Sequence, residues 1–182
     1  DQNFCVEWAK KRNFEIFIEQ YDVKAYKKEL SISLEEAARK VRYQKLKEVA
    51  ELWKADKIAL GHHRNDQVET ILMNIIRGTG INGLRGMPIR NGKFIRPLLR
   101  TSLDEIHRYL EEQHLAFVID STNLDQSFLR NRIRNGLIPL LKQDYNAKIE
   151  EIIFRMGLNI QESLSIIPEE KWSIEKKGRL FR

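Results

Sequence analysis

The chain has 182 residues, a formal charge of +6 and 42% hydrophobic residues, which fits one main globular domain and favours an anionic partner such as a nucleic acid. Its single cysteine, Cys5, excludes an intramolecular disulfide and a zinc site built from several thiolates. No apolar stretch approaches the roughly 20 residues of a membrane-spanning helix, and no signal-like segment opens the sequence, so we expect a cytoplasmic protein with no membrane partner.

The first half of the chain alternates between predicted helices and strands. It opens in a helical pattern without an initiating Met, so we expect it to be a piece of a longer polypeptide. Residues 14–23 alternate apolar and polar side chains as a strand does, and residues 57–63 are a short apolar run ending at a polar turn. Between them, residues 33–53 have apolar side chains at helical spacing behind a Ser33–Glu36 capping box. This alternation predicts an α/β fold with parallel strands and crossover helices.

The second half predicts mostly helices. The pair Asn91-Gly92 predicts a small β-hairpin, in which both turn residues need positive φ. Ser102 and Glu105 form a second capping box before another helix, and residues 116–120 look like one more strand. Further helices are expected over residues 68–78, 128–142 and 146–166.

The densest group of polar residues is GHHRNDQVET, residues 61–70, at a strand-to-helix turn where α/β folds gather ligands. Asp66 and Glu69 have two interpretations. They could cap the helix, or they could hold an ammonium group near a phosphate, because adjacent imidazole and guanidinium groups would balance the anion. A metal site is disfavoured, because His62 and His63 are neighbours that would point to opposite faces of a strand.

Two basic stretches predict contact with phosphate. From Arg77 to Arg100, and again from Arg130 to Lys142, every charged residue is basic, whereas solvated faces usually mix both signs. The first stretch is rich in glycine, so its backbone N–H groups could approach an anion closely. Chance clustering in a basic protein and a flexible linker are the alternatives.

Taken in order, these motifs resemble those of the tRNA(Ile)-lysidine synthases, which are N-type ATP pyrophosphatases of the PP-loop family. The likeness spans roughly residues 1–156 and rests on LGHHRNDQVETILMNIIRGTGINGLRGM, SLEEAARKVRY, IRPLL, IDSTNLD and RNRIR. It implies a Rossmann-like parallel sheet of the adenine nucleotide alpha hydrolase type. We therefore expect an incomplete Rossmann-like domain over residues 1–100, a helical continuation over 101–167 and an unassigned tail over 168–182.

The resemblance also implies an ATP-dependent ligase. In the family, the C2 oxygen of the wobble cytidine of an isoleucine tRNA with a CAU anticodon attacks the α-phosphate of ATP. The ε-amine of free L-lysine then displaces AMP. The implied cofactors are ATP and Mg²⁺, the partners are the tRNA and lysine, and a homodimer is compatible. The family's Ser-Gly-Gly-x-Asp-Ser loop, which should grip ATP, does not occur in this sequence, so we expect the fragment to be inactive alone.

Matched position by position, the resemblance gives roles to the polar residues of the turn. The catalytic residues would be His63, Arg42 and Asp66, with Arg42 and His63 stabilising charge on the phosphate. Asp66, Glu69 and Arg42 would bind lysine, and one carboxylate could help to deprotonate its amine. No residue is expected to ligate a metal.

The remaining roles fall on the two basic stretches. Arg77, Gly78 and Gly80 would border the nucleotide or the cytidine, and Arg130 and Arg134, one helical turn apart, would meet RNA phosphates from one helix face. The absence of a Cys-x-x-Cys pair argues against the related sulfur-inserting tRNA enzymes. The alternatives are a noncatalytic RNA-binding relative without ATP hydrolysis, or another adenylating enzyme of tRNA modification.

Overall fold

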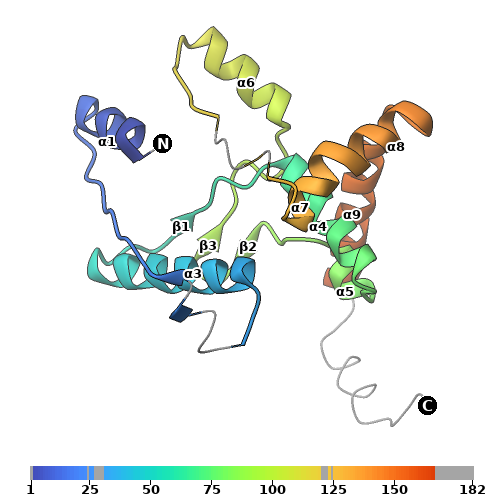
Figure 1. The fold of residues 1–182 in the computed structure, drawn as a ribbon, viewed down its shortest axis with the longest axis horizontal. Coiled ribbons are helices and arrows are strands. Elements are labelled where there is room, and N and C mark those ends of the chain that lie inside the picture. Colours follow the sequence, from blue (N-terminus) through green and yellow to red (C-terminus); the bar gives the residue numbers. More distant parts are fainter. Residues whose placement is uncertain (1, 24, 27–30, 120–122, 124, 167–182) are drawn as a thin grey trace. The chain divides into compact units, whose positions relative to one another are not determined.

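The computed structural model describes residues 2–23, 25–26, 31–119, 123 and 125–166 (Figure 1). It divides the chain into two compact units. Unit 1 comprises Asp1–Leu60, Arg90–Ile95 and Ala116–Asp120, and unit 2 comprises Gly61–Ile89, Arg96–Leu115 and Ser121–Arg182. The division at residues 100 and 167 remains a prediction, and residues 168–182 lie outside the described part.

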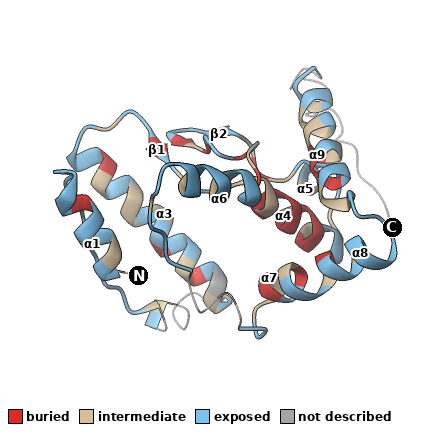
Figure 2. Ribbon diagram, turned by 90° about the horizontal axis from the view of Figure 1, so that it is seen from above, coloured by how far each residue is buried: buried red, intermediate tan, exposed pale blue. Residues whose placement is uncertain are grey.

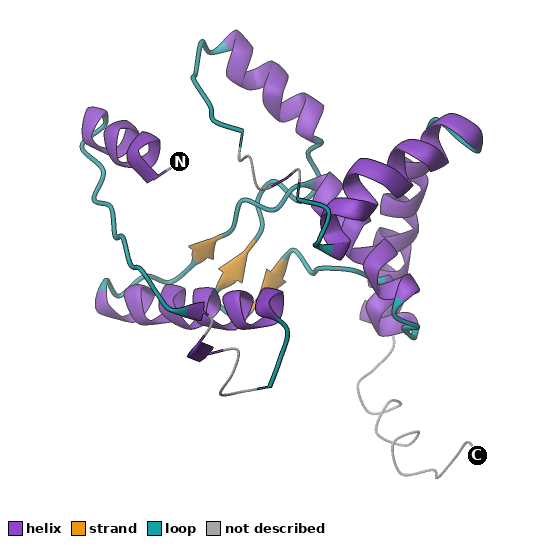
Figure 3. Ribbon diagram, viewed as in Figure 1, coloured by secondary structure: helices purple, strands orange, loops and turns teal. Residues whose placement is uncertain are grey.

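Unit 1 contains a small mixed sheet with a helix packed beside it. Strand β1 (Ile58–Ala59) runs parallel to β3 (Phe94–Ile95), and β2 (Arg90–Asn91) pairs with β3 antiparallel, in the order β1-β3-β2 (Figure 3). Helix α3 (Leu34–Leu52) contributes Ala50 to a buried cluster with Ile58 and Phe94. A helix packed on a sheet confirms the α/β class, although the described sheet is mixed rather than all parallel.

The N-terminal helices of unit 1 agree with the sequence patterns. Helix α1 is Gln2–Lys11, and α3 begins after Ser33, whose hydroxyl oxygen accepts a hydrogen bond from the Glu36 N–H at 3.1 Å. This bond satisfies one of the N–H groups that the first helical turn leaves free.

Two predicted strands are wrong within the described residues. Residues 14–22 and 116–119 are irregular, and residue 120 lies outside the described part. The apolar side chains of the first stretch are not covered by a sheet face, since Phe17 is 53% exposed and Ile18 47%. Alternation reports only that side chains could share a face, whereas a strand also needs a neighbouring strand to pair with.

The β-hairpin is confirmed, but its turn lies one residue later than predicted. Asn91 pairs with Phe94, so the turn residues are Gly92 and Lys93. Gly92 alone of the two has positive φ, at 59°. Glycine at the first turn position and an ordinary residue at the second is the pattern of a type II′ rather than a type I′ turn.

Unit 2 is helical and packs around α4 (Arg64–Ile76), whose buried face is red in Figure 2. Helix α4 contacts α9 (Ile149–Ile166), α5 (Ile81–Leu84) and α7 (Leu129–Arg132). The buried core consists of Val68, Ile71, Leu72, Met73, Ile133, Ile138, Ile153 and Phe154. Helix α6 (Leu103–Glu112) completes the predicted set, and none of the described helices is both long and apolar enough to cross a membrane.

The helix predicted over residues 128–142 is interrupted by a π-helical turn. Helix α7 continues into η2 (Ile133–Leu137) and then into α8 (Ile138–Asp144). Pro139 near the start of α8 explains the wider turn, because a proline has no N–H to donate and its ring crowds the carbonyl four residues earlier.

Candidate functional site

The polar turn before α4 caps the helix through Asp66. His63 is the N-cap residue and has an extended backbone. The Asp66 Oδ2 atom accepts a hydrogen bond from the His63 N–H at 3.0 Å, and the His63 Nε2 atom lies 3.4 Å from the same oxygen. The capping interpretation is therefore confirmed for Asp66, whereas the Glu69 carboxylate points elsewhere.

Asp66 and Glu69 are both held by two arginines from the α7–η2 segment. Arg130 Nε donates to Glu69 Oε2 at 2.6 Å, and Arg130 Nη2 donates to Asp66 Oδ1 at 3.1 Å. Arg134 donates to Glu69 Oε1 from Nε at 2.5 Å and to Asp66 Oδ1 from Nη2 at 3.3 Å. We call Asp66, Glu69, Arg130 and Arg134 the acid–arginine cluster. Each carboxylate therefore contacts both guanidinium groups.

The acids of this cluster are more buried than its arginines. The side chains of Glu69 and Asp66 are 1% and 12% exposed, and those of Arg130 and Arg134 are 26% and 31% exposed. Burial alone would lower the pKa of Arg134, but the hydrogen bond to Glu69 and the charges of Glu69 and Asp66 outweigh it and raise that pKa. The Arg134 guanidinium therefore stays charged, and both arginines are more exposed to solvent than the acids that they contact.

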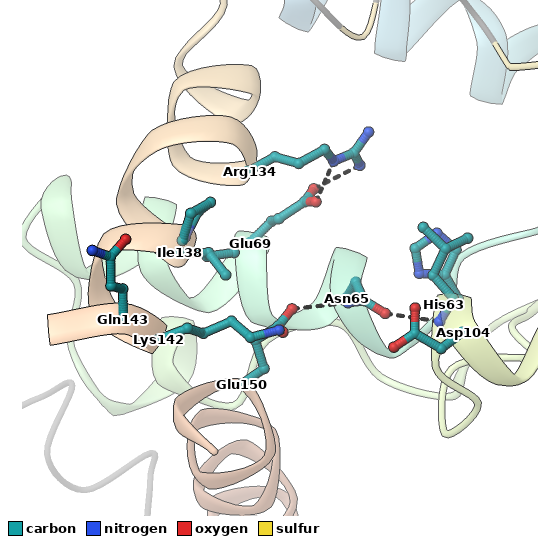
Figure 4. Close-up of a pocket in the computed structure, with 11 residues that line it drawn as sticks. His63, Asn65, Glu69, Asp104, Arg134, Ile138, Lys142, Gln143 and Glu150 are labelled. Atoms are coloured by element: carbon teal, nitrogen blue, oxygen red, sulfur yellow. Dashed lines mark hydrogen bonds and ion pairs between the residues drawn. The ribbon is translucent and has the colours of Figure 1, made fainter. Parts of the chain in front are cut away.

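A cavity of about 480 Å³ adjoins the cluster in unit 2 (Figure 4). Glu69 and Arg134 of the cluster line it together with His63. Its other charged side chains include Lys142 and Glu150, whose Nζ and Oε2 atoms are 2.8 Å apart. A cavity that carries both charge signs suits a ligand with charges of its own.

Asn65 lines this cavity and forms hydrogen bonds to residues of two other helices. Its Nδ2 group donates to Glu150 Oε1 at 2.8 Å, and its Oδ1 atom accepts from the Leu103 N–H at 2.9 Å. One side chain of α4 therefore joins the beginnings of α6 and α9.

The glycine-rich loop after α4 is fixed by a buried amide. Gln67 is fully buried, and its Oε1 accepts from the Met87 N–H at 2.7 Å, while its Nε2 donates to the carbonyls of Arg85 and Met87 at 3.2 and 3.1 Å. Gly86 lies directly against this side chain with φ of 65°, and a Cβ there would be 2.6 Å from Gln67 Nε2. The Arg85–Met87 end of the loop is therefore ordered rather than a flexible linker.

The residues predicted to border a nucleotide lie at the other end of this loop. Arg77 is exposed and ends α4, and Gly78 follows with φ of 75°. Gly80 is the N-cap of α5, and no atom lies within 4 Å of a Cβ built at Gly78 or Gly80. Their backbone is open, and their predicted role stays a prediction.

The predicted site residues do not all lie in the same unit. The structure brings His63, Asp66 and Glu69 together with Arg130 and Arg134. The two arginines bind acids here, and their predicted contact with RNA phosphates stays a prediction. Arg42 belongs to unit 1, on the exposed side of α3, and is described with that unit alone.

One arginine of the two basic stretches is buried rather than exposed to solvent. Arg96 is 3% exposed, and its Nη1 donates to the Pro88 carbonyl at 2.8 Å. The expectation that the whole stretch from Arg77 to Arg100 faces phosphate is therefore wrong at this position.

Sequence reasoning missed Gln67, Asn65 and the pairing of the cluster. A signal for Gln67 was present, because it is a polar residue on the face of α4 that also carries Ile71. A polar side chain at a core position must find buried partners. No local signal could reveal the pairing, since more than sixty positions of sequence separate the acids from the arginines.

Comparison with known proteins defines the class first. A family model described as a PP-loop domain matches residues 1–141, and the chain therefore belongs to the PP-loop family. The solved U34-tRNA thiolase NcsA from Methanococcus maripaludis, which has a 4Fe-4S cluster, superposes with a TM-score of 0.64 at 20% identity. This likeness covers 90% of this chain and 56% of the thiolase, and it supports the Rossmann-like fold of the PP-loop enzymes.

Within this family, the similar curated proteins are tRNA(Ile)-lysidine synthases. The one from Thermosipho africanus is 41% identical over 98% of this chain, and that from Clostridium acetobutylicum 40% over 86%. The one from Bacteroides thetaiotaomicron is 39% identical over 91% of the chain. The chain spans 42%, 34% and 39% of the lengths of these three relatives. The resemblance seen in the motifs is thereby confirmed.

Proposed function

We propose that the full-length protein is a tRNA(Ile)-lysidine synthase, an ATP-dependent ligase that forms a C–N bond on RNA. It adenylates the wobble cytidine of an isoleucine tRNA with a CAU anticodon and attaches free L-lysine to C2, releasing pyrophosphate and then AMP. The observation that carries the proposal is the pair of buried carboxylates, Asp66 and Glu69, beside a charged cavity in a chain 41% identical to a relative of that name.

The two carboxylates can bind the ε-ammonium group of lysine and take part in its deprotonation. A protonated ε-amine is held by a carboxylate, and only the neutral amine can attack C2, so a carboxylate near the ammonium both binds it and takes part in its deprotonation. Glu69 lines the cavity, and Asp66 is bonded to the turn through His63. His63 and Arg42 are assigned to the stabilisation of phosphate charge.

The remaining assignments concern the nucleotide and the RNA. Arg77, Gly78 and Gly80 border the nucleotide or the flipped cytidine, where open backbone can approach closely. Arg130 and Arg134 contact RNA phosphates when the tRNA is bound. We also assign the protein to the cytoplasm, where ATP, lysine and tRNA are available, and include a homodimer among its states.

Magnesium enters with ATP rather than through the described side chains. Among the residues that the structure describes, no group of three or more His, Cys, Asp or Glu side chains is placed to hold a metal ion. Asp66 and Glu69 face arginines instead. These residues do not fit a protein-held Mg²⁺.

The test is to incubate the full-length protein with ATP, labelled lysine and an isoleucine tRNA transcript carrying CAU. Label should become attached to the RNA, and AMP and pyrophosphate should be released. A matched transcript with U in place of the wobble C should remain unlabelled, as should the reaction without ATP. Tight binding of the transcript with no label would overturn the proposal and favour a noncatalytic RNA-binding protein.

A further inference from the structure

The acid–arginine cluster is balanced in charge before any substrate binds. Two carboxylates face two guanidinium groups, and every one of the four side chains contacts both members of the opposite sign. Arg134 has a further contact, from its Nη1 to the Asn123 Oδ1 atom at 3.0 Å. The neighbouring part of the cavity carries the Lys142–Glu150 pair and one further carboxylate, Asp104.

An ammonium group cannot simply be added to this cluster. It would leave one positive charge uncompensated in a site where Glu69 is almost completely buried, and unpaired buried charge is costly. The acids are also occupied, because Nε of each arginine already donates to a Glu69 oxygen. A cation can therefore enter only if an anion enters with it, or if an arginine turns away.

The arginines are placed to meet that anion. Their side chains are 26% and 31% exposed, whereas the Asp66 and Glu69 side chains are 12% and 1% exposed. Arg134 lines the cavity together with Glu69. Figure 4 shows its guanidinium group beside the Glu69 carboxylate, with dashed lines marking the contacts between them. A phosphate arriving from solvent meets the guanidinium groups before it meets the acids.

We propose that Arg130 and Arg134 make binding of the amine substrate depend on binding of an anion. With no ligand, they neutralise Asp66 and Glu69. When a phosphate of the RNA draws the guanidinium groups outward, the two carboxylates are released to take the ammonium group. The identity of the amine, L-lysine, and of the RNA rests on the proposed function.

This arrangement couples the two substrates thermodynamically. If RNA raises the affinity for lysine, lysine raises the affinity for RNA by the same factor, and such couplings are typically about 5- to 150-fold. The consequence is specificity, because a free cation is excluded from the acids until RNA is present.

The experiment measures lysine binding calorimetrically on the full-length protein without ATP, so that no turnover occurs. We expect the tRNA transcript to tighten lysine binding about tenfold. In Arg134→Gln, lysine should bind the free protein more tightly and gain little from RNA. The matched control is Arg132→Gln, since the Nη1 of Arg132 donates to the carbonyls of Gln126 and Ser127 and not to the acids. This control should keep the tenfold gain.

A second measurement does not depend on any variant folding. The Nε–Hε signals of Arg130 and Arg134 in the wild-type protein should be slow to exchange with water when free, and should shift and exchange faster with saturating transcript. Unchanged signals, or equal lysine affinity with and without RNA, would overturn the inference. If labelled lysine still reaches the RNA in that case, the proposed function stands. If no label is attached but the signals shift, the proposed function falls and the release of the acids by an anion is supported.

Discussion

The Nε atom of Arg130 lies 2.6 Å from Oε2 of Glu69, and this contact joins helix α7 to the middle of α4. Glu69 is 1% exposed and neighbours Val68 in the core of unit 2. A buried ion pair of this kind contributes little net stability compared with apolar packing, but removing one partner leaves the other unpaired. The cluster therefore constrains what can replace Glu69 more than it strengthens the fold.

Glu69→Gln should lower the free energy of unfolding by about 1–3 kcal/mol, because Arg130 and Arg134 keep Asp66 but each loses a buried charged acceptor. Urea denaturation measures the change. Glu48→Gln, the same substitution at an exposed residue paired with Lys45, should shift the urea midpoint far less. Equal shifts in the two variants would show that burial of Glu69 has no energetic weight.

Gln67→Ala should loosen the glycine-rich loop. The Met87 N–H loses its acceptor, Gln67 Oε1 at 2.7 Å, and two carbonyls lose a donor. An unsatisfied buried group costs about 1–3 kcal/mol, so the Met87 amide should exchange with solvent about tenfold faster or more. Gln161→Ala is the matched control, because Gln161 donates to the same carbonyls but accepts nothing from Met87. Similar Met87 exchange rates in both variants would contradict the role of Gln67.

The sequence predicted the features that depend on neighbouring residues, and it missed those that depend on contacts between residues far apart in the chain. The caps of α3 by Ser33 and of α6 by Ser102 depend on a few neighbouring residues, and both caps are present. Strands at 14–23 and 116–120 needed partners, which alternation cannot supply. The site divides in the same way, because His63 and Asp66 share one turn, whereas the contact of Glu69 with Arg130 depends on how α4 packs against α7.

Gly86→Ala should destabilise unit 2 more than Gly92→Ala destabilises the hairpin. Both glycines have positive φ, 65° and 59°, which costs an alanine roughly 1–2 kcal/mol. Only at Gly86 does the new Cβ also meet atoms, at 2.6 Å from Gln67 Nε2, whereas nothing lies within 4 Å at Gly92. The difference between the two urea midpoints measures the cost of this steric contact. A larger loss of stability in Gly92→Ala than in Gly86→Ala would contradict the prediction.

Ser102→Ala should raise the pKa of Glu105 towards its ordinary value. In the folded chain the Ser102 hydroxyl and N–H donate to Glu105 Oε2 at 2.6 and 2.7 Å, and these two hydrogen bonds lower the pKa of that carboxyl. Because the folded pKa is below the unfolded one, the bonds stabilise the start of α6 at pH values above the unfolded pKa, and this stabilisation is lost as pH falls through the folded pKa.

An NMR titration of the Glu105 carboxyl carbon measures this shift directly. In Ser102→Ala the hydroxyl is lost and only the backbone N–H remains, so the midpoint should rise, and the acid-induced loss of stability should become shallower. Ser102→Thr retains a hydroxyl and should keep the low midpoint, because the cap depends on the oxygen rather than on the size of the side chain. A midpoint that stays unchanged in Ser102→Ala would contradict the role of the hydroxyl and assign the lowered pKa first to the Ser102 backbone N–H and then to Arg64, whose Nη2 lies 3.4 Å from the same oxygen.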